Sequence, residues 1–453
     1  MNILLVSNGF PPSAFGGVEV YVYQLAKIFS AQKHQVTVFC RESSESLPDY
    51  HVIDETVDGI RIIRIVNDYK NTSTFNATYE DPHIEKIFHD ILQEISPELI
   101  HFNHLITLSY RLPLLARDAG IPSIISLHDY WPFCFRVQLV DWMENHCRGP
   151  LNGGNCYLCI QGGHGGLRTR ATRLMKDLVP YTWRQTIRKK VIRSSSKSYL
   201  SNLSEDLINE RYESYQQAIL SVRRIFTPSR YIKHQYEING YPKDSFQVVR
   251  LGIDMPDSGN NFDKFTNEHS SNQRMRFTFV GTLIPNKGPD ILIRAFKRLD
   301  NKKISLSIYG REDVAPSHYL NLLKELANGD ERIVFKGSFN QDERGEVYRN
   351  SDVVVIPSRF PETFSIVAHE GLAYGKPIIA SDIGAIPEVV ADGMNGILVL
   401  PGDEDALYSV LKNVIEDAGV LKKLECPGPI EIYSTAEHGE FMQKVYAEVI
   451  GNE

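Results

Sequence analysis

Short, unbroken apolar segments recur along this chain and constrain its fold more than any other feature. Ile3 to Val6 is such a run; apolar residues at helical spacing follow from Val18 to Phe29, and Val36 to Phe39 is the next run. Leu99 to Phe102 and Ser123 to Leu127 continue the alternation. Because strands without a polar face must be covered on both sides, this pattern predicts a doubly wound α/β domain with a parallel sheet.

A second series of the same kind begins after Arg274, and 453 residues are too many for one hydrophobic core. We therefore predict two α/β domains, spanning residues 1–220 and 221–432, and a C-terminal helix within 433–453 that packs back on the first domain. The strands predicted for the second domain are Phe277 to Val280, Ile304 to Tyr309, Ile333 to Phe335, Val353 to Ile356, Ile378 to Ala380 and Ile397 to Val399.

Composition excludes several classes of function. A net charge of −7 argues against nucleic-acid binding, which usually requires a basic surface. The apolar runs are shorter than the ~20 residues that a membrane-spanning helix needs. Met1 to Val6 lacks the basic start of a signal peptide. We therefore expect a cytoplasmic location, and the six cysteines agree with a reducing compartment.

One segment is strongly basic on this acidic chain. Residues 167–217 are expected to form a helical insertion in the first domain, and Leu167 to Lys197 carries ten Lys and Arg residues against the single Asp177. One interpretation is a solvated helix face. The other is contact with anionic lipid head groups at the inner face of a membrane, because interfacial helices combine a basic face with anchors such as Trp183.

Two glycine-containing loops follow predicted strands, where ligands bind in open α/β sheets. Gly16-Gly17 leads into a helix whose N-terminal N–H groups suit a phosphate, although a Gly pair is often only a turn. In the second loop, after Gly281, Lys287 precedes a helix and could neutralise a phosphate oxygen or be an ordinary surface lysine.

Two carboxylates lie in the third loop region, after Val353 to Ile356. A helix is predicted to begin near Glu362, and Glu370 is expected about two turns into it. A carboxylate can accept hydrogen bonds from two vicinal hydroxyls of a ribose or another sugar. The alternative is that both acids are buried in salt bridges, although no basic residue lies between them in sequence and only His369 is adjacent.

Taken together, these segments resemble the retaining GT-B glycosyltransferases of family 4. The resemblance is carried by Pro361-Glu362-Thr363-Phe364 through Glu370-Gly371 with its E-x7-E spacing, Ser381-Asp382-Ile383-Gly384 through Asn395-Gly396, Phe10-Pro11-Pro12, His128-Asp129, Thr227-Pro228-Ser229 and Lys287-Gly288. It implies two Rossmann-like domains facing a cleft and the transfer of a hexose from a nucleotide sugar, most simply UDP-linked, to a saccharide acceptor. A lipid-linked acceptor in cell-surface polysaccharide synthesis would agree with the basic segment.

The resemblance also implies roles for single residues. Glu370 would hold the ribose, whereas Glu362, His128 and Lys287 would serve the reacting centre, with Lys287 countering the diphosphate charge. The further residues implied in donor binding are Gly16 and Gly17 near the phosphates, Gly281, the amides of Phe364, Ser365 and Ile366 at the sugar and diphosphate, and Lys336 and Gly337 at the base.

The sequence departs from the family pattern in two places. Thr282 stands where an Arg often follows the glycine, so Arg359 could help Lys287 with the diphosphate. Phe364 to Ile366 lacks the glycines that many members have there. No Asp-x-Asp-like pair is positioned for a metal-bound diphosphate, so we expect catalysis without a metal or another cofactor.

Four cysteines form a separate cluster. Cys134, Cys147, Cys156 and Cys159 are spaced C-x12-C-x8-C-x2-C. They could bind a structural Zn²⁺, remain reduced thiols or form disulfides.

Other functions on the same fold remain as alternatives. These are a sugar epimerase, an α-glucan phosphorylase, for whose lysine-bound cofactor the chain has no matching segment, or a non-catalytic binding protein. Glu362, Glu370 and Lys287 together favour an active glycosyltransferase.

Overall fold

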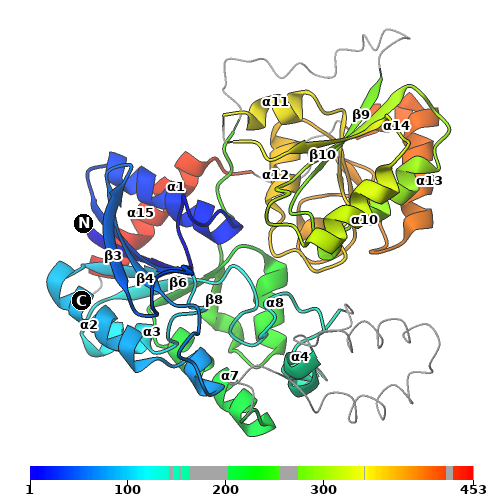
Figure 1. Ribbon diagram of the computed structural model, residues 1–453. Helices are drawn as coiled ribbons and strands as arrows, with labels where there is room; N and C mark the ends of the chain where they lie inside the picture. Colours follow the sequence, from blue (N-terminus) through cyan, green and yellow to red (C-terminus); the bar gives the residue numbers. More distant parts are fainter. Residues whose placement is uncertain are drawn as a thin grey trace. The chain divides into compact units, whose positions relative to one another are not determined.

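The chain divides into two compact units in the computed structural model, which describes residues 1–141, 146–152, 155–162, 202–255, 274–340, 342–424 and 432–451 (Figure 1). Unit 1 comprises Met1–Arg250 and His438–Glu453, and unit 2 comprises Leu251–Glu437. Residues 163–201, which include most of the predicted basic insertion, lie outside the described residues. The rest of that insertion contributes to α7 (Glu205–Leu220).

An eight-stranded sheet forms the centre of unit 1, in the order β3-β4-β2-β1-β5-β6-β7-β8. Its strands are β1 (Asn2–Ser7), β2 (Gln35–Glu42), β3 (Val52–Val57), β4 (Ile60–Val66), β5 (Leu99–Phe102), β6 (Ser123–Ser126), β7 (Arg224–Thr227) and β8 (Phe246–Val248). Paired strands are parallel except for the β3–β4 hairpin. The hairpin was not predicted, because β3 is a largely polar edge strand without a continuous apolar run.

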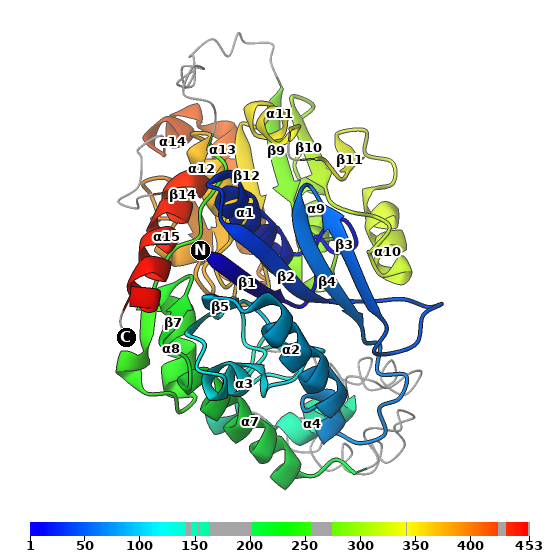
Figure 2. The same ribbon diagram turned by 90° about the vertical axis from the view of Figure 1, so that its left-hand side faces the viewer.

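Helices cover both faces of this sheet (Figures 1 and 2). They are α1 (Gly17–Ala31), α2 (Pro82–Ile95), α3 (Leu112–Asp118), α4 (Cys156–Gly162), α7, α8 (Arg230–Ile238) and α15 (Thr435–Gly451). The C-terminal helix α15 lies beside α1, and the rings of Phe29 and Tyr446 are 4.9 Å apart. The Tyr446 hydroxyl is also 2.6 Å from Nδ1 of the buried His101 on β5, so α15 completes the core of unit 1.

The boundary predicted at residue 220 is wrong. The chain stays in unit 1 as far as Arg250, because β7 pairs with β6 and β8 pairs with β7. Phe226 and Phe246 are buried in this unit. Strands of three and four residues carry too little apolar pattern to be assigned to one sheet or another from sequence.

Six parallel strands form the sheet of unit 2, in the order β11-β10-β9-β12-β13-β14. They are β9 (Met275–Val280), β10 (Ile304–Tyr309), β11 (Ile333–Gly337), β12 (Val353–Ile356), β13 (Ile378–Ser381) and β14 (Gly396–Val399). The helices are α9 (Pro289–Lys297), α10 (Ser317–Ala327), α11 (Arg344–Arg349), α12 (Ile366–Ala373), α13 (Glu404–Glu416) and α14 (Ala418–Lys423). The two doubly wound α/β units confirm the predicted fold class.

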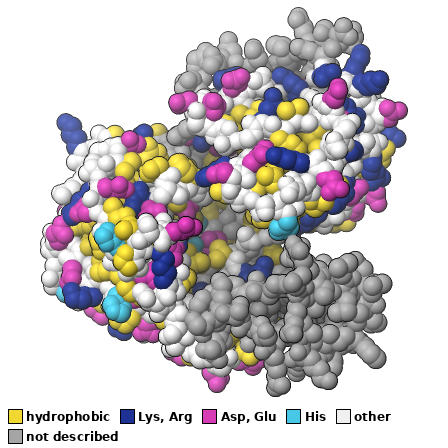
Figure 3. Space-filling model, in the orientation of Figure 1, with side chains coloured by type: hydrophobic (Ala, Val, Ile, Leu, Met, Phe, Trp, Pro, Cys, Tyr) yellow, Lys and Arg dark blue, Asp and Glu magenta, His cyan; other side chains and the backbone are white. Residues whose placement is uncertain are grey.

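Charged side chains of both signs are interspersed over the described surface drawn in Figure 3. None of the helices in the described parts of the chain combines the length and the apolar character that crossing a bilayer requires.

Candidate active site

An ion pair joins two loops at the carboxyl ends of neighbouring strands in unit 2. The Lys287 ammonium, in the loop after β9, lies 2.7 and 2.9 Å from the two carboxylate oxygens of Glu362, in the loop after β12. The Ser358 hydroxyl donates a third hydrogen bond, 2.6 Å long, to the same carboxylate. The Glu362 side chain is 8% exposed and that of Lys287 is 26% exposed, so the buried anion is paired while the cation still reaches solvent.

Two glycines allow these loops to approach one another closely. A Cβ on Gly288, at φ +71°, would lie 2.0 Å from the Pro357 carbonyl oxygen. A Cβ on Gly384, at φ +65° in the loop after β13, would lie 2.4 Å from both the backbone nitrogen and the backbone oxygen of Glu362. The backbone positions of Lys287 and Glu362 are therefore fixed by contacts that only glycine permits. Gly288 and Gly384 entered the sequence analysis only as members of the motifs that carry the resemblance, and no role was predicted for either.

Glu370 has its own partners, both on α11. It is buried on α12, where it accepts a 2.6 Å hydrogen bond from the Tyr348 hydroxyl and lies 3.1 Å from Nε of Arg344. Burial raises the pKa of the Glu370 carboxyl, although Arg344 and Tyr348 act in the opposite direction. Arg344 also binds Asp254 at 2.6 Å, which in turn accepts a hydrogen bond from Thr435.

Both acids are thus salt-bridged, which was the alternative to sugar binding in the sequence analysis. Their cations come from segments remote in sequence, Lys287 for Glu362 and Arg344 for Glu370, so the absence of a basic residue between the two acids was not informative. Pairing does not exclude a role in binding, because the Lys287 side chain is 26% exposed and an anionic ligand can replace Glu362 as its partner.

The helix after β12 begins later than predicted. Residue Ser365 is the N-cap of α12 and has φ +63°, so Glu362 lies in the preceding loop and not at the helix start. Glu370 is the fifth residue of the helix, about one turn in instead of two. The first amides of α12, including that of Ile366, have no intrahelical acceptor and can serve ligand oxygens. The Phe364 ring stacks on His369 with centroids 3.8 Å apart, which fixes this turn.

Arg359 is occupied elsewhere. Its guanidinium lies 2.7 Å from the Asp290 carboxylate and 3.0 Å from the Pro285 carbonyl. Burial would raise the pKa of Asp290, but hydrogen bonds from Arg359 and Tyr319 outweigh burial and lower it. The hypothesis that Arg359 assists with the diphosphate is therefore not supported by this arrangement; Arg359 instead fixes the loop that carries Lys287.

The remaining predicted residues of unit 2 lie along the same edge of the sheet. Gly281 follows β9, and a Cβ on Gly310, after β10, would lie 2.3 Å from its carbonyl oxygen. Lys336, which is exposed, and Gly337, which has φ +72°, end the edge strand β11. They are separated from β9 by β10, and their contact with a base stays a prediction.

His128 belongs to unit 1, directly beyond β6. Its Nε2 atom is 3.4 Å from the Asn103 side-chain oxygen, and its ring is 4.8 Å from that of Tyr21. Burial lowers the pKa of His128 to about 3, so the imidazole is neutral at physiological pH. It can therefore offer a hydrogen bond but not a positive charge.

The loop before α1 is anchored by an arginine that the sequence analysis missed. The buried Arg64 donates hydrogen bonds to the carbonyls of Phe10 and Pro11, at 2.9 and 2.8 Å, and pairs with Glu42 and Glu55. Gly16 is the N-cap of α1, and a Cβ there would lie 2.3 Å from a carboxylate oxygen of Glu19. Gly16 and Gly17 thus lie at the start of α1, after the loop that follows β1, and their place beside a phosphate stays a prediction.

The two parallel-sheet α/β units have the fold of GT-B glycosyltransferases. Residues 15–186 match the family described as Glycosyltransferase Family 4, and residues 274–417 match the family described as Glycosyl transferases group 1. An uncharacterized glycosyltransferase of Methanocaldococcus jannaschii, MJ1607, is 32% identical over 427 residues, which cover 92% of this chain and 90% of that protein. The chain therefore belongs to the group 1/family 4 glycosyltransferases.

Other relatives match more locally or only in fold. D-inositol 3-phosphate glycosyltransferase of Corynebacterium glutamicum is 32% identical over 184 residues, covering 39% of this chain and 44% of that one. Sucrose-phosphate synthase of Thermosynechococcus elongatus has a TM-score of 0.65 at 18% identity and covers 100% of this chain and 99% of its own. Anabaena Alr3699/HepE, solved with UDP and glucose, has a TM-score of 0.59 at 14% identity and covers 99% of both chains.

Proposed function

We propose that this glycosyltransferase moves a hexose from a UDP-linked sugar to a saccharide acceptor, with retention of the anomeric configuration and without a metal ion. The observation that carries the proposal is the Lys287–Glu362 pair beside the first amides of α12, at the carboxyl ends of β9 and β12. In this proposal the diphosphate exchanges with Glu362 as the partner of Lys287. The freed carboxylate then faces the sugar.

The chemistry follows from where negative charge develops. The bond between the anomeric carbon and the diphosphate oxygen breaks, and the acceptor oxygen bonds to the same face of that carbon. The proton of the acceptor hydroxyl passes to the departing diphosphate. Lys287 and the amides of Phe364, Ser365 and Ile366 stabilise the charge on the leaving group. Neutral His128 donates a hydrogen bond to a sugar oxygen, and Glu370 accepts hydrogen bonds from the ribose hydroxyls.

Support for the donor and the acceptor comes from different sources. Alr3699/HepE was solved with UDP and with UDP-glucose, which favours a uridine nucleotide here. The basic segment Leu167 to Lys197, outside the described residues, favours a lipid-linked acceptor and a cytoplasmic protein that associates peripherally with an anionic membrane face. Loss of co-sedimentation with anionic vesicles after charge reversal in this segment would support that part of the proposal; equal sedimentation would contradict it.

The deciding experiment combines binding with turnover. Thermal unfolding is measured with UDP, GDP, ADP and their hexose conjugates in the presence of chelator; a ligand at 100 times its dissociation constant adds about 2.7 kcal/mol. We expect a shift with uridine nucleotides only, lost in Glu370→Gln and kept in Glu362→Gln. Product analysis by NMR with an oligosaccharide acceptor should then show the donor's anomeric configuration, and Glu362→Gln should not turn over.

Each alternative predicts a different result. An epimerase would convert the sugar nucleotide without an acceptor, and a non-catalytic protein would bind it without any product. Dependence of turnover on a divalent cation, or an inverted product, would contradict the proposed mechanism while leaving the family assignment intact.

A further inference from the structure

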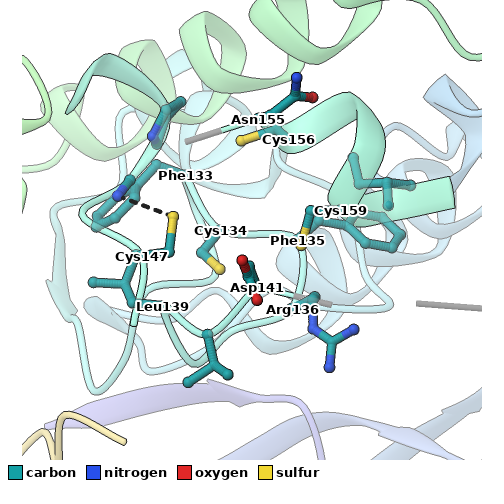
Figure 4. Close-up of a pocket in the computed structure, with 14 residues that line it drawn as sticks. Phe133, Cys134, Phe135, Arg136, Leu139, Asp141, Cys147, Asn155, Cys156 and Cys159 are labelled. Atoms are coloured by element: carbon teal, nitrogen blue, oxygen red, sulfur yellow. Dashed lines mark hydrogen bonds between the residues drawn. The ribbon is translucent and has the colours of Figure 1, made fainter. Parts of the chain in front are cut away.

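A pocket in unit 1, remote in sequence from the nucleotide-site residues, collects four of the chain's six cysteines (Figure 4). Cys134, Cys147, Cys156 and Cys159 all line it, together with apolar side chains that include Phe133 and Ile160. All four are free thiols. They come from three segments that follow β6, so the fold itself gathers them around one cavity of about 40 Å³, large enough for an ion.

Local backbone structure brings the segments together. The Cys147 amide donates to the Leu139 carbonyl at 2.7 Å, and an antiparallel β-bridge pairs Val140 with His146 next to it. Cys156 and Cys159 are one turn apart on α4, and the Asn155 side chain accepts a hydrogen bond from the Leu158 amide at the start of that helix. Residues three apart lie on the same helix face, so both thiols can face one ion.

Backbone amides point at two of the sulfurs. Gly149 donates to Sγ of Cys147 at 3.4 Å, drawn as a dashed line in Figure 4. The amides of Arg136, Gln138 and Leu139 hydrogen-bond to Cys134. The turns that aim these amides need the left-handed backbone region at Val137, Leu139 and Gly149, with φ values of +70°, +50° and +93°. Hydrogen bonds of this kind favour a thiolate over a thiol and orient metal-bound sulfur.

Four thiolates around one centre repel one another, so they require a cation among them. One positive charge already lies next to the cluster. The Arg211 guanidinium is 5.7 Å from the ring centroid of Phe135, which lines the same pocket. It is held by the carbonyls of Trp131 and Pro132, at 2.6 and 3.0 Å.

We propose that Cys134, Cys147, Cys156 and Cys159 bind one structural Zn²⁺ through four thiolates. The four thiols release four protons to solvent, four Zn–S bonds form, and the site carries a charge of −2. As placed, no three His, Cys, Asp or Glu side chains among the described residues already converge as metal ligands. Closure of the four sulfurs on the ion, by rotation of side chains on a backbone that is already assembled, is therefore part of the proposal.

The ion would fasten Cys134, Cys147, Cys156 and Cys159 to one another in the part of unit 1 that follows His128. Soft thiolate ligands select Zn²⁺ over Mg²⁺ or Ca²⁺. The site takes no part in bond breaking, because its ligands leave no open position for substrate. Its loss should therefore change the stability of unit 1 and leave nucleotide binding by unit 2 unchanged.

The test uses the full chain purified under reducing conditions with zinc in the growth medium. Elemental analysis should give one zinc per chain in the wild type and in Cys40→Ser, a control at a buried cysteine outside the cluster. Cys156→Ser should lose most of the zinc. Replacement of zinc by cobalt in the wild type should produce the visible spectrum of a tetrahedral thiolate complex, which does not depend on any variant folding.

Three results would overturn the proposal. One is wild-type protein without zinc after incubation with the metal, in which all four thiols react with a thiol reagent. Another is a mass under non-reducing conditions that shows disulfides among these cysteines. The third is zinc retained equally in Cys156→Ser. Binding of UDP, measured in parallel, separates a failure of this site from a failure of the proposed glycosyl transfer.

Discussion

At the scale of single residues, we expect substitutions of Lys287 and of Glu362 to lower the free energy of unfolding by different amounts. Lys287→Met leaves the buried Glu362 carboxylate with Ser358 alone, and we expect a loss of about 2 kcal/mol in the free energy of unfolding, typical of a buried group without its partner. Glu362→Gln removes the buried charge and keeps an acceptor for Ser358, so it should cost less. Urea unfolding without ligand measures both.

The double variant is the control for that prediction. If the two side chains interact directly, Lys287→Met with Glu362→Gln should be more stable than the sum of the single effects allows. Additive single effects would mean that the pair is not energetically coupled.

We expect the affinity for the nucleotide to depend on pH, because the Glu370 carboxyl can take up a proton. Burial raises the pKa of this carboxyl. It therefore takes up a proton at a higher pH than an ordinary glutamate, whose pKa is about 4.3. The protonated form accepts hydrogen bonds from the ribose less well, and affinity for UDP should fall. Calorimetric titration from neutral to mildly acidic pH measures this; Glu370→Gln should bind weakly without that dependence, and a flat profile in the wild type would contradict the assignment.

The effect of the same group on stability has the opposite sign. Because the folded chain holds this proton more tightly than the unfolded chain, the contribution of Glu370 to stability is present below the unfolded pKa. It is lost as pH rises through the raised folded pKa. Ligand-free Glu370→Gln should therefore lack this decrease in stability on raising the pH.

At the scale of elements, the loop after β13 depends on glycine at position 384. Gly384→Ala puts a methyl group 2.4 Å from the backbone of Glu362, in addition to the strain of a positive φ. Gly393, at φ +74°, has the same strain with nothing within 4 Å of its Cβ, so Gly393→Ala is the matched control. We expect about 1 kcal/mol of destabilisation for the control, from the left-handed backbone alone, and clearly more for Gly384→Ala by thermal unfolding. Equal losses would mean that the loops can separate at no cost.

The start of α12 stores strain of the same type. Ser365 is buried with φ +63°, where a residue with a Cβ is disfavoured, and Ser365→Gly should stabilise the ligand-free chain by about 1 kcal/mol. Ser365→Ala, which retains the Cβ, should bring no gain. Chemical unfolding of both variants compares them, and a loss in Ser365→Gly would show that the serine hydroxyl matters more than the backbone.

The sequence predicted the strands of both sheets well where they are unbroken apolar runs, such as β1 and β12, because burial on both faces leaves no other pattern. The start of α12 was missed because Ser365 adopts a backbone conformation that its residue type does not signal. The partners of the two acids were missed for a different reason. Lys287 and Glu362 are 75 residues apart, and only the pairing of β9 with β12 brings their loops together.

At the scale of the whole molecule, unit 1 is discontinuous in sequence. Residues 1–250 lack α15, whose side chains cover part of the core of unit 1. Nε2 of His438 on this helix lies 3.0 Å from the Tyr21 hydroxyl, and the Tyr446 hydroxyl contacts His101. A fragment of residues 1–250 should therefore show no cooperative thermal transition, whereas residues 251–437 should fold alone. Circular dichroism on the two fragments tests this, and addition of a peptide of residues 435–453 should rescue the first. A cooperative transition in 1–250 alone would contradict the role given to α15.

The return of α15 to the first unit also sets an order of events during synthesis. His438 and Tyr446 are synthesised after the whole of unit 2, so Tyr21, Phe29 and His101 of unit 1 await their cover until then. Multidomain chains usually complete their N-terminal domain first. Here unit 1 is completed only when its C-terminal helix has been made. Until then, the apolar side of α1 is a surface that a chaperone would recognise.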